Sequence, residues 1–281
     1  MPELPEVEVL RRHLLPAIKG RKITGVHINR EKVIRPTTPV ALKRGLAGAQ
    51  IVDLTRRGKF LLFQLCKERQ AAQLLGHLGM TGRMYVQPKK DPLPKHTAVH
   101  LELGAKRFVY EDTRYFGRFT LDVSAVENLG PEPWSEDFTP DGFRSALGRS
   151  AQAIKVKLLD QALVAGVGNI YASEALFRAG ISPRKAARRL TRKQCARLHE
   201  TIREVLADAI ECGSTIPLDF SGSGKRDGLF YYGLPDGAAD YYQERLLMYD
   251  REGEPCPRCG APIRRIVQAA RSTFFCPQCQ K

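Results

Sequence analysis

The chain is short of acidic residues, contains a single tryptophan and has no long apolar run. Lys and Arg number 45 against 30 Asp and Glu, which gives a formal net charge of +15 and a pI near 9.7. No stretch approaches the ~20 apolar residues that a membrane-spanning helix needs. The start of the chain also lacks a charged segment followed by an apolar one, so we do not expect secretion. The basic excess favours a polyanionic partner, and nucleic acid is the leading candidate.

The chain has seven cysteines but no secretion signal. In a reducing compartment a cysteine cluster binds metal more often than it forms disulfides. Four of them form two Cys-x-x-Cys pairs separated by sixteen residues, namely Cys256, Cys259, Cys276 and Cys279. This spacing predicts one zinc ion held by four thiolates, and four protein ligands make such a site structural rather than catalytic. The scattered Cys66, Cys195 and Cys212 are expected to be buried free thiols.

The first six residues, Met1-Pro2-Glu3-Leu4-Pro5-Glu6, can supply a nucleophile. Methionine is normally removed when a small residue follows, so we expect Pro2 to provide a free secondary amine. A model α-amino group has a pKa of ~7.7–8.0, and an unprotonated amine can attack an aldehyde-like carbon to form a Schiff base. Glu3 and Glu6 share one helix face and are candidate proton carriers. Helix capping explains the same residue types, and it is the favoured explanation of this segment taken alone.

The periodicity of the chain changes near residue 130. A helix is predicted from Glu3 to about Ile18, where apolar residues recur at spacings of three and four. Short strand-like segments follow and indicate a β-sandwich or barrel: 22–29, 49–54, 59–65, 73–78, 83–86, 97–103, 107–111 and 118–123. Beyond a proline-rich connection, helices are predicted at 140–147, 153–163, 169–179 and 192–212. The expected fold class is α+β: an N-terminal helix and β-sandwich, then a helical part with a C-terminal zinc-held hairpin.

Two glycine-rich segments interrupt the helical part. Gly166-Val167-Gly168 directly precedes a predicted helix, and backbone N–H groups at such a helix start suit a phosphate. A packing turn is the commoner explanation of a lone Gly-x-Gly. Residues 217–240 show neither period, and a loop of this length is usually functional or disordered.

Taken together, the motifs of the whole chain resemble those of the formamidopyrimidine-DNA glycosylase family, bacterial enzymes that remove oxidised purines such as 8-oxoguanine from DNA. In chain order they are Pro2–Glu8, Arg57–Lys59, His77–Met80, Asp112–Gly117, the stretch from Leu159 to Tyr171, and the zinc finger with Arg271-Ser272-Thr273. The resemblance implies DNA bound in a cleft between two domains. It implies a catalytic β-sandwich domain (1–130), a linker and first helix (131–150), a helix-two-turns-helix domain with a lesion-capping loop (151–243) and a zinc finger (244–281).

The resemblance also implies roles for individual residues. Pro2 would be the nucleophile at the anomeric carbon of the sugar, with Glu3 as proton donor and acceptor, supported by Glu6. Lys59 would serve the damaged nucleotide and the elimination step, and Arg271 is placed with these catalytic residues. Chemistry on a base requires its extrusion from the duplex, and the space would be refilled by Met80, Arg114 and Phe116. The remaining expected DNA contacts are Lys155 and Asn169, which with Arg271 match phosphate-gripping positions, and His96, Arg149 and Ser150.

The resemblance implies a bifunctional glycosylase and abasic-site lyase of base excision repair, acting as a monomer on double-stranded DNA in the cytoplasm, at the nucleoid. Two alternatives remain: an endonuclease VIII-like enzyme for oxidised pyrimidines, and a non-catalytic zinc-finger DNA-binding protein. Leu4-Pro5-Glu6 and the intact wedge set favour the purine enzyme over the first. Retention of Pro2, Glu3 and Lys59 disfavours the second. The chain departs from the family at Tyr115, where a second basic residue is usual, and in its longer loop at 217–242.

Overall fold

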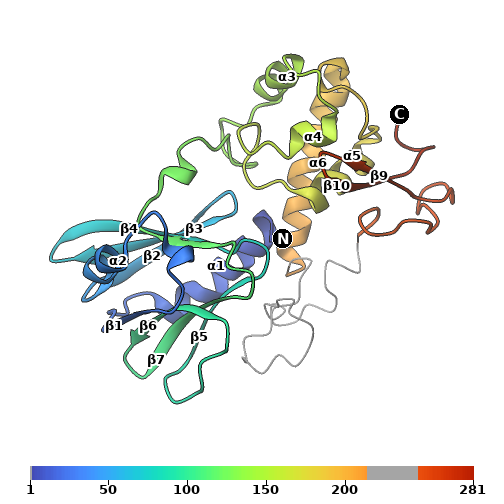
Figure 1. Cartoon of the computed structure of the whole chain (residues 1–281). Coiled ribbons are helices and arrows are strands. Elements are labelled where there is room, and N and C mark those ends of the chain that lie inside the picture. The colour runs from blue at the N-terminus through green and yellow to red at the C-terminus, as the bar shows by residue number, and fades with distance from the viewer. Residues whose placement is uncertain (1, 214–245) are drawn as a thin grey trace. The chain divides into compact units, whose positions relative to one another are not determined.

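The computed structural model describes residues 2–213 and 246–281 (Figure 1). The chain divides into two compact units: the described part of the first comprises residues 2–127 and Gly213, and that of the second comprises 128–212 and 246–281. The glycine-rich segment 217–242 lies outside the described residues. Within the described part, no helix is both long enough and apolar enough to cross a membrane.

The first unit is a β-sandwich of two antiparallel four-stranded sheets with a helix at its N-terminus. One sheet has the strand order β1 (Gly25–Ile28), β6 (Thr97–Leu103), β7 (Lys106–Asp112) and β5 (Gly82–Pro88). The other has the order β2 (Gln50–Arg57), β3 (Phe60–Lys67), β4 (Gln70–His77) and β8 (Arg118–Thr120). Their apolar faces form one core together with helix α1 (Leu4–Ile18), in which Phe63, Phe108 and Phe119 pack edge-to-face or stacked.

Helix α1 is fixed to the sandwich by its apolar stripe and by one buried carboxylate. The five apolar positions that predicted the helix, Leu4, Val7, Leu10, Leu14 and Ile18, are all buried. On another face, Glu8 makes ion pairs with Arg11 at 2.8 Å, Arg12 at 2.9 Å and Arg56 of β2 at 3.1 Å. Burial alone would raise the pKa of Glu8, but the hydrogen bonds from Arg11 and Arg12 and the charges of Arg11 and Arg56 outweigh it and lower that pKa to about 2.

The second unit is helical and ends in a two-stranded hairpin. Its elements are α3 (Pro140–Gly148), α4 (Ile154–Leu158), α5 (Asn169–Ala179), the 3₁₀ turn η3 (Ala187–Arg189), α6 (Arg192–Glu211), β9 (Arg264–Gln268) and β10 (Arg271–Phe275). Thr139 and Thr191 cap α3 and α6, and Gly180 in the left-handed conformation ends α5. The carboxylate of Glu174, within α5, accepts backbone N–H bonds from Leu247, Met248 and Tyr249 at 2.8–3.0 Å. It thereby anchors the segment that leads into the hairpin.

The α+β class and the zinc-held hairpin expected from the sequence are confirmed, and three details differ. A second helix, α2 (Pro39–Leu46), stands where none was predicted, capped by Thr38 and opened by Pro39. The helix predicted at 153–163 ends at Leu158, because the chain turns at Asp160, whose side chain binds Lys157 and the backbone of Ala162. Of the three isolated thiols only Cys195 is buried, and the other two are half-buried. Between β1 and α2 lies a further 3₁₀ turn, η1 (Glu31–Ile34), and after β8 comes η2 (Ser124–Val126).

Candidate active site and nucleic-acid interface

In the first unit, the proposed catalytic carboxylates lie at the start of α1. Pro2 is buried and directly precedes Glu3, the N-cap residue of α1. Glu6 Oε2 accepts the backbone N–H of Glu3 at 2.7 Å. Only 2% of Glu3 and 1% of Glu6 is exposed, and the two residues form a capping box in which the Glu3 side chain accepts the backbone N–H of Glu6. The capping expected of this segment is therefore present, and both carboxylates are buried directly after Pro2 in the chain.

Lys59 lies in the two-residue turn between β2 and β3, after Gly58 in the left-handed conformation. Its side chain is buried, close enough to His77 at the end of β4 for its charge to act on that ring. Burial, with the charges of Lys59 and Arg118, lowers the pKa of His77 to about 4, so the imidazole is neutral at neutral pH. His77 Nδ1 accepts the N–H of Gly79 at 3.2 Å, which leaves the proton on Nε2.

His77 was not singled out from the sequence, although it begins the quoted motif His77-Leu78-Gly79-Met80. It shares this corner of the unit with Lys59 and Phe60, whose ring centroid lies 4.7 Å from that of the imidazole. A neutral imidazole with Nε2–H can donate a hydrogen bond to an anion without adding charge. The sequence of the motif alone gave no reason to choose His77 rather than Met80 as a functional residue.

The predicted wedge residues Met80, Arg114 and Phe116 converge, although they come from two separate loops. Arg114 Nη1 lies 3.3 Å from Met80 Sδ, and the guanidinium carbon lies 4.6 Å from the centre of the Phe116 ring. Met80 and Phe116 are 43% and 46% exposed, so two large apolar side chains reach the surface at the same place. A flexible thioether, a flat ring and a guanidinium thus form one exposed cluster.

Two glycines and one carboxylate hold the two loops together. A Cβ at Gly79 would lie 2.6 Å from Gly117 N, and one at Gly117 would lie 1.9 Å from the Tyr110 hydroxyl, so only glycine allows this approach. Asp112 is fully buried and accepts hydrogen bonds from both loops, from Thr81 Oγ1 at 2.6 Å and from Gly117 N at 2.9 Å. It also accepts the backbone N–H of Arg114 at 3.1 Å and the Tyr110 hydroxyl at 3.5 Å. Asp112 was quoted as part of a motif, but its organising position was not predicted.

Two basic side chains, Arg30 and Lys32, lie next to Tyr115 and the neighbouring Phe116. Tyr115 has a positive φ of 53°, and its hydroxyl accepts a hydrogen bond from Arg30 Nε at 3.1 Å. The Lys32 ammonium lies 5.2 Å from the centre of the neighbouring Phe116 ring. Two cations from outside the motif therefore lie against it. His96 is half-exposed, and its carbonyl accepts the N–H of Asp112 at the base of the same loop.

In the second unit, Lys155 and Asn169 form a cluster at the start of two helices. Lys155 Nζ donates to Asn169 Oδ1 at 2.8 Å and lies 3.5 Å from Thr273 Oγ1. Asn169 Nδ2 donates to the carbonyl of Ser272, the residue after exposed Arg271. The first turn of α5 and the hairpin β9–β10 thus meet at these side chains. Arg149 and Ser150 lie at the end of α3, outside this cluster.

Gln161 is a further residue that the sequence did not single out. Its side-chain amide donates to the carbonyl of Val167 at 2.8 Å and accepts the N–H of Gly166 at 3.0 Å. These bonds hold the glycine turn before α5 and so orient the N-terminus of α5, which begins at Asn169. Backbone N–H groups at a helix N-terminus favour an anion. The Leu159-Asp160-Gln161 motif was the available signal.

The four tail cysteines fit a zinc ion. Their sulfur atoms all lie within 4.8 Å of one another, with Cys256 and Cys279 3.9 Å apart and Cys259 and Cys276 3.5 Å apart. A tetrahedral site with Zn–S bonds of 2.3 Å has sulfur atoms about 3.8 Å apart. The zinc is structural, since all four ligands come from the protein, and it holds the ends of the β9–β10 hairpin.

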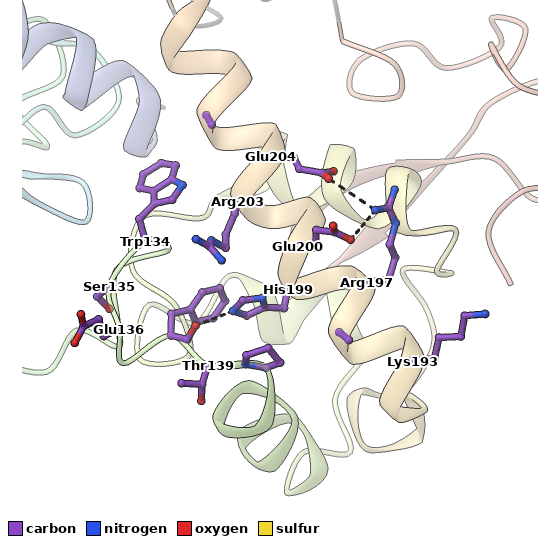
Figure 2. Close-up of a pocket in the computed structure, with 14 residues that line it drawn as sticks. Trp134, Ser135, Glu136, Thr139, Lys193, Arg197, His199, Glu200, Arg203 and Glu204 are labelled. Atoms are coloured by element: carbon purple, nitrogen blue, oxygen red, sulfur yellow. Dashed lines mark hydrogen bonds and ion pairs between the residues drawn. The ribbon is translucent and has the colours of Figure 1, made fainter.

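A pocket in the second unit lies away from these clusters. It is formed by residues 134–140 and one face of α6 (Figure 2). At its base, the ring of His199 stacks on Phe138 at 4.3 Å and its Nε2 lies 2.7 Å from the Phe138 carbonyl. Arg197 is paired with Glu200 and Glu204. None of the predicted site residues lines this pocket.

Comparison with known proteins assigns the three parts of the chain to one family. Models of the formamidopyrimidine-DNA glycosylase N-terminal domain and of its H2TH domain match residues 1–119 and 129–220, and a zinc-finger model of the same enzymes and IleRS matches 253–281. The chain is 42% identical to the formamidopyrimidine-DNA glycosylase of Thermus thermophilus over 100% of its length and 98% of that protein. It is 44% identical to that of Cupriavidus pinatubonensis over 100% of both.

Solved structures agree with this assignment. A Lactococcus lactis Fpg variant in complex with Fapy-dG-containing DNA is 36% identical, with a TM-score of 0.87 over 100% of both chains. The complex of Lactococcus lactis Fpg with DNA that contains an abasic site gives a TM-score of 0.86 at 35% identity over 99% of both chains. With matches over all three parts and identities near 40% along the full length, the chain belongs to the formamidopyrimidine-DNA glycosylase family.

Proposed function

We propose that this chain is a bifunctional DNA glycosylase and abasic-site lyase of base excision repair that excises oxidised purines, 8-oxoguanine and formamidopyrimidines, from double-stranded DNA. The observation that carries the proposal is the burial of Glu3 and Glu6 at the start of α1, directly beside Pro2. The DNA complexes of the Lactococcus lactis relatives, with Fapy-dG and with an abasic site, support the choice of substrate.

The proposed chemistry begins when removal of Met1 frees the Pro2 amine. The nitrogen attacks the anomeric carbon, and the base leaves with the electron pair of the glycosidic bond and a proton. Opening of the sugar ring, with a proton from Glu3 to the ring oxygen, gives an iminium on Pro2. Glu6 holds the backbone of Glu3, and Lys59 acts on the damaged nucleotide and in the elimination. Loss of a proton from the adjacent sugar carbon expels the 3′ phosphate, and a second elimination expels the 5′ phosphate. Hydrolysis then frees Pro2.

The exposed cluster of Met80, Arg114 and Phe116 is suited to the space that an extruded base leaves. Apolar side chains can wedge between bases, while a guanidinium can hydrogen-bond the orphaned partner. In the second unit, Lys155, Asn169 and Arg271 would grip phosphates, with His96, Arg149 and Ser150 as further contacts. We propose that the protein acts as a monomer in the cytoplasm, at the nucleoid. We also propose that its functional parts are the four ranges given above: the catalytic domain (1–130), the linker and first helix (131–150), the helix-two-turns-helix domain (151–243) and the zinc finger (244–281).

Borohydride trapping tests the proposal. Borohydride reduces an iminium to a stable amine, so wild-type protein should become covalently linked to duplexes that carry 8-oxoguanine or an abasic site, and far less to one that carries an oxidised pyrimidine. Protein that retains Met1 should not be trapped, because its Pro2 nitrogen is an amide. Normal trapping with the N-terminus blocked would refute the role of Pro2. A preference for the pyrimidine lesion would instead assign the endonuclease VIII type of substrate, and no trapping at all would leave the non-catalytic alternative.

A further inference from the structure

Three potential metal ligands lie together on the paired strands β1 and β6 of the first unit, and Figure 1 labels these two strands next to each other. His27 faces His100 in the antiparallel register, and Gly25 faces Glu102. Side chains two residues apart on a strand share a face, and directly opposed side chains lie next to each other. One ligand atom each of His27, His100 and Glu102 lies within 4.8 Å of the other two. None of these residues belongs to the proposed DNA chemistry.

The protein leaves both space and hydrogen-bonding capacity in this cluster. His100 is only 7% exposed; its Nε2 lies 3.7 Å from Glu102 Oε1, and its Nδ1 has no hydrogen-bond partner among the described residues. A buried polar atom without a partner is costly, by about 1–3 kcal/mol. At Gly25 a Cβ would lie 3.0 Å from Glu102 Cγ and 3.4 Å from His27 Nε2, so glycine keeps the space between these two side chains open.

We propose that His27, His100 and Glu102 form a second metal site that takes a borderline divalent ion such as Zn²⁺, Co²⁺, Ni²⁺ or Cu²⁺. Two imidazoles and one carboxylate favour these ions, whereas Mg²⁺ and Ca²⁺ prefer sites made of oxygen ligands. Three protein ligands leave further coordination positions to water. The bound ion would tie the edge strand β1 to β6.

Without a bound ion, two side chains at the cluster, His27 and Lys89, are not placed for metal binding and would have to move. The imidazoles of His27 and His100 are stacked, with centroids 4.3 Å apart and planes at 5°, so their nitrogen lone pairs lie in nearly parallel planes and do not point at a common ion. His27 is exposed, and a side-chain rotation can turn its nitrogen towards His100 and Glu102 without a change of the backbone. Lys89 Nζ lies 3.0 Å from Glu102 Oε2, and its side chain is 59% exposed. An incoming cation would displace this ammonium into solvent, so Lys89 is a competitor of the metal ion.

Cobalt titration of the zinc-loaded protein tests the site, because Co²⁺ reports its ligands by its visible spectrum. Wild type should bind one Co²⁺ beyond the structural zinc, with d–d bands and no thiolate-to-cobalt charge-transfer band. Removal of an outer partner of a metal ligand already costs 10–100-fold in affinity, so His27→Gln should weaken binding by at least about tenfold. His27 is exposed, so this variant should fold. His13→Gln is the matched control and should bind like wild type, whereas Lys89→Gln should bind more tightly.

The outcomes separate the site from its alternatives. Charge-transfer bands would show exchange into the cysteine site and overturn the proposal, as would equal Co²⁺ binding by wild type and His27→Gln. An ion that binds the folded state raises the thermal midpoint by mass action, so micromolar Zn²⁺ should raise that of wild type more than that of His27→Gln. Equal shifts would also count against the site. Trapping on an 8-oxoguanine duplex should be the same for both proteins, so this result is independent of the proposed function.

Discussion

Asp112 offers the sharpest test of how the exposed Met80–Arg114–Phe116 cluster is held. Its carboxylate accepts four hydrogen bonds, of which those from Thr81 and Arg114 reach Oδ1 and those from Gly117 and Tyr110 reach Oδ2. Asp112→Asn preserves the shape but replaces one acceptor by an NH₂ donor. In either orientation, this donor would face a backbone N–H group. The variant therefore loosens the turn that carries two of the three wedge residues without touching any of them.

The size of the effect follows from these contacts. Hydrogen bonds to a charged group contribute about 1.5–3 kcal/mol, and a buried donor left without a partner costs about 1–3 kcal/mol. Arg114 N has Thr81 Oγ1 as a second acceptor at 3.3 Å, whereas Gly117 N donates only to Oδ2, so the amide nitrogen should take the Oδ1 position. We expect a loss of about 1–3 kcal/mol in unfolding free energy. If the same energy is lost in the transition state of base extrusion, excision should slow by roughly 5- to 150-fold.

Two single-turnover rates, measured on protein whose folded fraction is known from a urea titration, decide the matter. Base excision from an 8-oxoguanine duplex should fall in Asp112→Asn far more than strand cleavage at a preformed abasic site, where no base has to be extruded. Asp122→Asn makes the same change at an exposed carboxylate that accepts from Ser124 N, and it should alter neither rate. If a destabilised Asp112→Asn variant excised the base at the wild-type rate, Asp112 would not be needed to position the wedge residues. An equal fall of both rates would reduce its role to folding.

Four further outcomes are expected. Phe116→Ala should slow excision of 8-oxoguanine but spare cleavage at an abasic site, and equal losses in both assays would contradict a wedge role. Chelation of zinc or Cys276→Ser should abolish duplex binding, because fold and metal are coupled in such sites, and full affinity without metal would refute this. The pKa of Glu8 is lower in the folded than in the unfolded protein, so its ionised form stabilises the fold, by on the order of 2 kcal/mol after solvent screening. This stabilisation is present above about pH 4.5 and is lost as the pH falls towards 2. Acid titrations of unfolding should show Glu8→Gln losing less stability over that range. Ala270→Gly should raise the thermal midpoint by relieving a positive φ of 57°, whereas Ala270→Val should lower it.

The elements with a strong period were the ones that sequence reasoning placed well. Helix α1 and strand β6 follow from apolar spacing, because their buried faces are continuous. Helix α2 was missed because it is only eight residues long. It buries just Leu42 and Leu46, too few apolar residues for a helical period to be recognised. Its capping residues, Thr38 and Pro39, were the readable signal. The error at α4 has the opposite origin, because apolar residues continue past Leu158 into a turn that Asp160 closes.

Site residues divide in a similar way. The four cysteines follow from spacing alone, because a metal imposes that spacing on the chain. For Met80, Arg114 and Phe116, only the family resemblance named them, since nothing local requires two loops to meet. What brings them together is the close approach of Gly79 and Gly117, which no local pattern predicts. Their proposed roles at the DNA remain predictions.

The hairpin β9–β10 shows how a distant constraint can replace a local one. Its two-residue turn has both Ala269 and Ala270 at positive φ, a geometry that normally selects Asn-Gly, and each alanine there costs roughly 1–2 kcal/mol. By turn chemistry this segment would not be predicted as a tight hairpin. The register is instead fixed from the other end, where Cys259 lies five residues before β9 and Cys276 directly follows β10. The cysteines on both sides of the hairpin bind one ion, so the metal can hold a turn whose own residues disfavour it.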